Sequence, residues 1–166
     1  MIRVDDHSPN VFLIDFGLAQ RFRNPATYVH IPHIKDRSTV GTLPFMSINA
    51  QRGFTQSRRD DLESLAYTII YLTRGSLPWG GSPGERSETI LSKKLSIPTG
   101  KLCEGLPTIF CDFVTHVQSL DFDEKPDYEY LHSILSQCMT DQHDKEPAPV
   151  RVCASADPTL VLGDRV

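Results

Sequence analysis

The chain has 166 residues, a formal net charge of -4 and a hydrophobic content of 39%. This length suits one domain with enough residues to bury a core. The mildly acidic balance argues against nucleic acid as the main partner, because such binding needs a basic surface. No apolar run approaches the length that spans a membrane, and the amino terminus lacks the apolar centre of a secretion signal.

The cysteines and histidines show no spacing typical of metal or redox sites. The four cysteines, at positions 103, 111, 138 and 153, include no C-x-x-C pair that would bring two thiolates to one centre. His30 and His33 flank Ile31-Pro32, which excludes a pair of histidine ligands on a helix. Reduced cysteines that pack in a core are typical of cytoplasmic or nuclear proteins, and we predict this location.

The first predicted elements are two short strands. Residues 11–14 form an apolar run after the turn residues Ser8-Pro9-Asn10, which predicts a strand, and we expect a second strand at residues 18–21. Residues 24–44 are polar, contain two internal prolines and show no helical period. We therefore expect a long loop there, and long loops in compact domains are often functional.

Four helices are predicted after this loop. The clearest begins at Ser57, which is a favourable N-cap with Asp60 three positions later, and ends at Gly75, which suits a left-handed C-cap. Apolar residues recur at helical spacing between these ends. Further helices are expected at about residues 85–95, after Pro107, and from Asp127 to Cys138.

These elements predict a mainly α-helical domain over residues 1–139, with a short β-strand pair at its start. Residues 140–166 contain three prolines, several charges and no apolar period, so we expect a disordered tail.

Asp15-Phe16-Gly17, directly after the predicted strand, is a tripeptide typical of protein kinases. There the aspartate carboxylate binds Mg²⁺ on the ATP phosphates. Three residues alone are a weak match, but further segments strengthen it because they follow in the order expected of a kinase. These segments are residues 40–49, 57–65, 75–79 and 122–128.

Together the segments resemble the carboxy-terminal lobe of the casein kinase 1 family of protein serine/threonine kinases. This family has Ser-Ile-Asn where most kinases have Ala-Pro-Glu, and Ser47-Ile48-Asn49 stands at that place here. The resemblance covers about residues 11–138. It implies a kinase-like lobe, the ATP-dependent phosphorylation of serine or threonine in protein substrates, and ATP and Mg²⁺ as cofactors in the complete family.

The resemblance also implies roles for five residues. Asp15 matches the Mg²⁺-binding aspartate, Phe16 the phenylalanine whose packing reports the active state, and Gly17 the hinge glycine. Thr42 matches the threonine whose hydroxyl braces the catalytic aspartate. Asp61 matches the buried aspartate that holds the catalytic-loop backbone, and as an acidic residue at a helix amino terminus it is also favoured by the helix dipole.

The chain departs from the family in three respects. The Gly-rich loop, strand lysine and catalytic loop of a kinase precede Asp-Phe-Gly, and none is found among the 14 residues before Asp15. Pro44 stands where family members use an arginine to bind an anionic group, and the stretch at residues 80–85 is shorter and more acidic than the lysine-rich stretch of the family. These two departures argue against recognition of primed or acidic substrates. We expect no kinase activity from this chain alone and no productive binding of ATP and Mg²⁺.

Two functions follow. The first is a partial kinase whose amino-terminal half is encoded upstream of Met1. The alternative is a non-catalytic, pseudokinase-like module that binds protein substrates or a kinase-interacting protein. An unrelated helical interaction domain would require the ordered motifs to coincide by chance, and we discount it. No oligomeric state follows from these residues.

Overall fold

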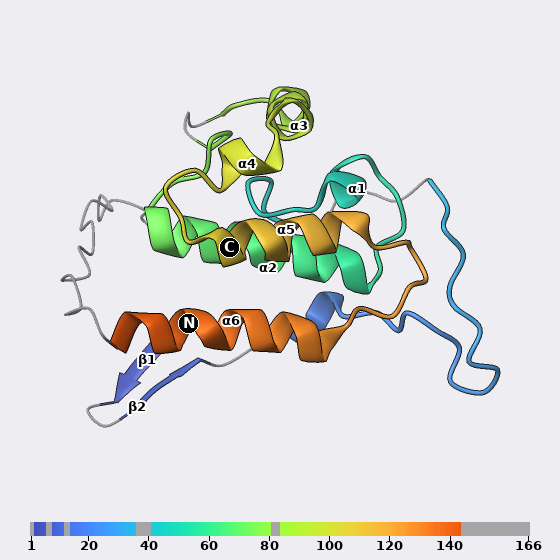
Figure 1. Ribbon diagram of the computed structural model, residues 1–166. Coiled ribbons are helices and arrows are strands. Elements are labelled where there is room, and N and C mark those ends of the chain that lie inside the picture. Colours follow the sequence, from blue (N-terminus) through green and yellow to red (C-terminus); the bar gives the residue numbers. More distant parts are fainter. Residues whose placement is uncertain (1, 6–7, 12–13, 36–40, 81–83, 144–166) are drawn as a thin grey trace, which may run out of the picture.

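The computed structural model describes residues 2–5, 8–11, 14–35, 41–80 and 84–143. It is mainly helical, which confirms the predicted fold class (Figure 1). In chain order the elements are β1 (Ile2–Asp5), β2 (Ser8–Val11), the 3-10 helix η1 (Phe16–Leu18), α1 (Ile48–Gln51), α2 (Arg58–Arg74), α3 (Ser87–Ser96), α4 (Thr99–Leu102), α5 (Thr108–Ser119) and α6 (Tyr128–His143).

Helix α2 has the two ends that the sequence predicted. At its start, the Ser57 N–H donates to Oδ2 of Asp60 over 2.8 Å, which satisfies a backbone donor that the helix itself leaves free. At its end, Gly75 adopts a left-handed conformation with φ 79°, and its N–H donates to the Tyr71 carbonyl over 2.7 Å. Each end of α2 is thus set by a hydrogen bond between residues no more than four positions apart.

Replacing Gly75 with alanine is expected to lower the free energy of unfolding by about 1 kcal/mol. A Cβ at this position meets no atom within 4 Å, so the cost comes from the left-handed backbone alone. Gly100, inside α4, is the matched control because a Cβ there also meets open space. Gly100→Ala should leave stability unchanged or raise it, since alanine favours helix. Urea unfolding of both variants tests the pair, and equal effects would contradict this account.

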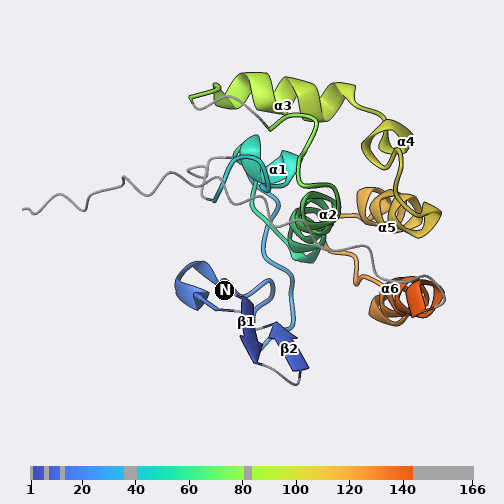
Figure 2. The same ribbon diagram turned by 90° about the vertical axis from the view of Figure 1, so that its left-hand side faces the viewer.

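The core is formed by α2 and its neighbours. Helices α2 and α5 run side by side through the middle of the molecule, α6 packs on α5, and α3 and α4 lie on the other side (Figures 1 and 2). The largest fully buried side chains of the described residues include Trp79, Tyr67 and Ile70. Trp79 is only 1% exposed.

The apolar residues of α2 are divided between a buried side and an exposed side of the helix. Ala66 and Ile70 are buried in the core, whereas Leu65 is 44% exposed and Leu72 is 66% exposed. The periodicity therefore predicted the helix correctly. It did not distinguish residues that pack in the core from apolar residues that remain on the surface.

The strand pair lies at the amino terminus, as expected, but in different residues. Strands β1 and β2 pair antiparallel, with Ile2 opposite Val11. The second strand predicted at residues 18–21 is wrong, because residues 16–18 form η1 and residues 19–21 form no strand. Of the predicted first strand, Val11 ends β2, residues 12–13 lie outside the described residues, and Ile14 is not in a strand. Strands joined by only two residues pair at a small cost in chain entropy, which favours the earlier hairpin.

The remaining helices lie close to their predicted positions. Helix α6 is capped by Asp127, whose Oδ1 accepts from the Tyr130 N–H over 2.9 Å, and it continues to His143 beyond the expected end at Cys138. Of the tail predicted over residues 140–166, residues 140–143 belong instead to α6, and residues 144–166 lie outside the described residues. Helices α1 and α4 were not predicted, since four residues are too few to show a helical period. No helix in the part of the chain described here combines the length and apolarity needed to cross a bilayer.

Candidate functional site

Asp15 caps η1 from a left-handed backbone conformation, with φ 66° and ψ 72°. Aspartate tolerates this region better than most residues because its short side chain bonds to the local backbone. Here its Oδ1 accepts from the Gly17 N–H over 3.4 Å, and the carboxylate is exposed. Phe16 is also exposed, at 65%. The exposed carboxylate fits the role of one Mg²⁺ ligand, because Mg²⁺ is commonly bound by one or two carboxylates together with substrate phosphates.

Among the described residues, no group of three histidine, cysteine, aspartate or glutamate side chains is arranged to hold a metal ion. Asp15 therefore belongs to no such group in this part of the chain. Any contribution it makes to Mg²⁺ binding is that of one ligand to an ion already held by phosphate oxygens.

Thr42 and Asp61 line a common pocket of about 350 Å³ between the 41–47 segment and α2. Asp15, Phe16 and Gly17 are not among the residues that line it. The structure thus brings together two of the predicted site residues and places the Asp-Phe-Gly tripeptide elsewhere. Ser64 and Thr68 of α2 also face this pocket.

Asp61 is exposed, which corrects the expectation of a buried aspartate at this position. Partial burial of its carboxyl group in the pocket and the neighbouring Asp60 carboxylate both raise the pKa of Asp61. Within the described residues no hydrogen bond reaches its carboxylate. The charged form of Asp61 therefore has little local support in this chain.

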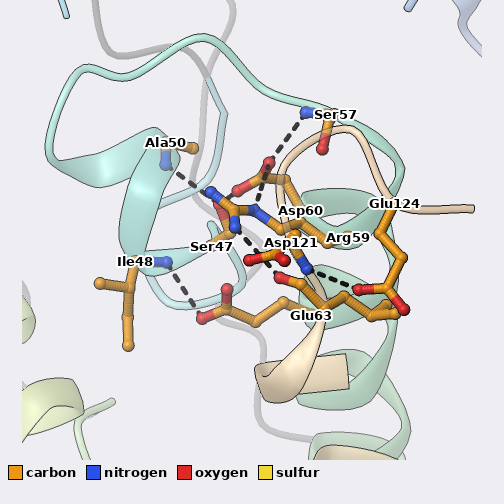
Figure 3. A network of polar contacts seen from close by, with 10 residues as sticks. Ser47, Ile48, Ala50, Ser57, Arg59, Asp60, Glu63, Asp121 and Glu124 are labelled. Atoms are coloured by element: carbon orange, nitrogen blue, oxygen red, sulfur yellow. Dashed lines mark hydrogen bonds and ion pairs between the residues drawn. The ribbon is translucent and has the colours of Figure 1, made fainter. Parts of the chain in front are cut away.

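Asp60 is the aspartate that the fold buries, with only 2% exposure (Figure 3). Its Oδ1 accepts from the Ser47 hydroxyl over 2.7 Å, and its Oδ2 accepts from the Ser57 N–H. The Ser47 oxygen in turn accepts from the Ala50 N–H over 3.0 Å and caps α1. One carboxylate thus joins the start of α1 to the start of α2.

Glu63 makes the second link between these elements and is 8% exposed. Its Oε1 accepts from the Ile48 N–H over 3.0 Å (Figure 3). The same oxygen accepts from the Tyr67 hydroxyl over 2.5 Å. Burial raises the pKa of Glu63, and the two hydrogen bonds oppose that shift. Burial and the adjacent Glu63 charge raise the pKa of Tyr67, so its hydroxyl stays protonated and donates.

Lys94 of α3 is a third buried charged residue, after Asp60 and Glu63, and is 4% exposed. Its Nζ donates to the carbonyls of Leu43 over 2.9 Å and Met46 over 2.6 Å. It lies 5.2 Å from the ring centroid of Tyr67 and 5.5 Å from that of Trp79. Burial lowers the pKa of Lys94 to about 8, although the Glu63 charge opposes this shift.

Glu63 and Lys94 were not singled out from the sequence. Each is a charged residue at helical spacing from buried residues, because Glu63 precedes Tyr67 by one helical turn and Lys94 follows Ile90 by one turn. Charges within a buried helical stripe were therefore the signal that could have found them.

A second cluster holds the 22–34 loop. His33 stacks on Phe122, with ring centroids 4.4 Å apart and an interplanar angle of 18°. Arg58 donates to the Asp123 carbonyl over 2.7 Å, and Arg59 donates to the Leu120 carbonyl over 3.1 Å. The two arginines thus bind the start of α2 to the connection between α5 and α6.

A comparison with protein families concerns the first 73 residues. The family described as fungal protein kinase matches residues 1–73. The matched stretch contains Asp15-Phe16-Gly17, Thr42, Asp61 and the whole 41–49 segment, whereas Lys94 lies beyond it. Residues 1–73 of this chain are therefore protein-kinase-like.

Proposed function

We propose that this chain is part of a casein kinase 1-like protein serine/threonine kinase and corresponds to its carboxy-terminal lobe. The observation that carries the proposal is the way Ser47-Ile48-Asn49 is bound. Asp60 accepts from the Ser47 hydroxyl, and Glu63 accepts from the Ile48 N–H. The tripeptide that suggested this family is thus anchored by two buried carboxylates on the helix that a kinase lobe uses as its centre.

The residues of this chain would contribute a limited part of the family reaction, which transfers phosphate from ATP to serine or threonine in proteins. The exposed carboxylate of Asp15 would bind Mg²⁺ on the ATP phosphates, and this ion neutralises phosphate charge when bound. Thr42 and Asp61 would support a catalytic loop from the pocket that they share. The 41–49 segment would contact the protein substrate.

The 166-residue polypeptide by itself is expected to transfer no measurable phosphate. Positioning and electrostatic stabilisation supply most of the rate in phosphoryl transfer. No Gly-rich loop or His-Arg-Asp sequence is present in these residues. Incubation with Mg-ATP and casein tests this expectation, with Asp15→Asn as the background. Transfer by the wild-type polypeptide above that of the variant would contradict it.

A chimera tests the assignment to the kinase family. The amino-terminal lobe and catalytic loop of an active casein kinase 1-type enzyme would be fused ahead of residue 14. We expect this protein to phosphorylate casein and Asp15→Asn to lower kcat at least about 100-fold, because charge neutralisation by the metal is worth several kcal/mol. Asp112→Asn is the matched control, since Asp112 is an exposed residue of α5. A folded but inactive chimera would contradict the assignment.

A second function is favoured by the exposed apolar side of α2, where Leu65 is 44% and Leu72 is 66% exposed. Apolar residues left on one side of a central helix are typical of a surface that a protein covers. Under this function the chain is a non-catalytic, pseudokinase-like binding module. The chimera would then fold and remain inactive, and Asp15→Asn would leave all of its properties unchanged.

A further inference from the structure

We propose that Lys94 is a positioning residue that holds the backbone of the 43–48 segment in the shape that a protein substrate meets. The naming of this segment as substrate-contacting rests on the proposed function. The positioning itself rests on contacts among α3, α2 and the segment. Lys94 is separated from Leu43 by 51 positions in the sequence, so α3 has to be in place before the contact forms.

The ammonium group of Lys94 has two backbone carbonyl acceptors and lies beside two aromatic rings. The carbonyls of Leu43 and Met46 accept from Nζ over 2.9 and 2.6 Å. The rings of Tyr67 and Trp79 lie beside it and exclude water. A buried ammonium is costly unless its N–H groups are bonded, and here the segment supplies the acceptors.

Other backbone groups of the segment are also bonded inward. The indole N–H of Trp79 donates to the Pro44 carbonyl over 2.9 Å. The N–H groups of Phe45 and Met46 both donate to the Thr42 carbonyl, over 2.9 and 3.1 Å. Proline at position 44 has no N–H to add. Donors from Lys94 and Trp79 therefore decide where the carbonyls of Leu43, Pro44 and Met46 lie.

Glu63 is the charged group on α2 that faces Lys94, and Asp60 lies beyond it on the same helix. Glu63 also accepts from the Ile48 N–H at the end of the segment. Lys94 and Glu63 thus hold the two ends of the 43–48 segment. Lys94 binds the Leu43 carbonyl, and Glu63 binds the Ile48 N–H. On α3 itself, Lys93 bonds instead to Glu85 over 2.5 Å at the surface.

This difference makes Lys93 and Lys94 a matched pair for mutation. Lys94→Met keeps the length and apolar stem of the side chain but leaves the carbonyls of Leu43 and Met46 without their donor. An unsatisfied buried group changes a local opening equilibrium by about tenfold to a hundredfold. Lys93→Met removes only a surface ion pair and should have little effect. Lys94→Arg retains N–H donors for both carbonyls, so its local opening equilibrium should stay close to that of wild type.

Trp79 is the only tryptophan of the chain, so its indole N–H resonance reports on the hydrogen bond to Pro44 without ambiguity. At pH 6.5 we expect the indole proton of Lys94→Met to exchange with solvent at least about tenfold faster than in wild type. Lys93→Met should match wild type, and Lys94→Arg should lie near it. Backbone amides of α5, such as those of Val114 and Val117, should keep their wild-type exchange in all three variants.

Wild-type indole exchange in Lys94→Met, with α5 intact, would overturn the proposal. Equal acceleration of the α5 amides would also overturn it, because Lys94 would then support the whole fold and not the segment. None of these measurements uses ATP or substrate, so they stand apart from the outcome of the chimera.

Discussion

Asp60→Ala is expected to lower the free energy of unfolding by about 2–4 kcal/mol, whereas Asp61→Ala should change it by less than about 0.5 kcal/mol. The two residues are neighbours with the same side chain, but Asp60 is 2% exposed and Asp61 is exposed. Removing the Asp60 carboxylate leaves the Ser47 hydroxyl and the Ser57 N–H without their acceptor in a buried region. Loss of both bonds from buried donors accounts for the expected size.

Urea unfolding at pH 7, followed by Trp79 fluorescence and by circular dichroism, measures both variants. Asp60→Asn is an informative third variant, because it keeps an acceptor for one donor and should lie between alanine and wild type. Asp61→Ala also removes a charge beside Asp60, so a small gain in stability is allowed by this account. A larger loss for Asp61→Ala than for Asp60→Ala would show that the burial of the two residues is reversed.

The second large effect is the contribution of Lys94 to the dependence of stability on pH. Burial lowers the pKa of Lys94 from 10.5 to about 8. Between these values the unfolded chain binds the proton and the folded chain does not, so the free energy of unfolding rises with pH. Over the whole window the gain of wild type relative to Lys94→Met approaches about 3 kcal/mol. The neutral amine still donates to the Leu43 and Met46 carbonyls, so the segment keeps its bonds.

The measurement compares urea unfolding of wild type and Lys94→Met at several pH values from 7.5 to 10.5. Tyrosines, cysteines and other lysines titrate in both proteins, and the difference between the two curves isolates Lys94. Lys93→Met serves as the control and should follow wild type, because Lys93 forms its ion pair at the surface. A difference that stays flat or falls with pH would contradict the burial of Lys94.

The sequence determined the parts of this protein that depend on residues close together in the chain. The ends of α2 follow from Ser57 with Asp60 and from the left-handed Gly75, and α6 follows from its Asp127 cap. Caps and positive-φ glycines act over a few positions, so their effect is visible without the fold. The Asp-Phe-Gly tripeptide and Ser47-Ile48-Asn49 are likewise local, and the match to protein kinases covers both.

Only the tertiary structure decided which polar residues are buried. Asp60 faces inward because Ser47, 13 positions earlier, packs against it, and the helical period alone does not choose between Asp60 and Asp61. Lys94 gains its role from carbonyls about 50 positions away. Hydrogen bonds between distant segments form only after the helices pack, since the entropy of closing such long loops must first be offset by burial. Which side chains are buried, and therefore which residues form the candidate site, is determined by contacts between segments that are distant in the sequence.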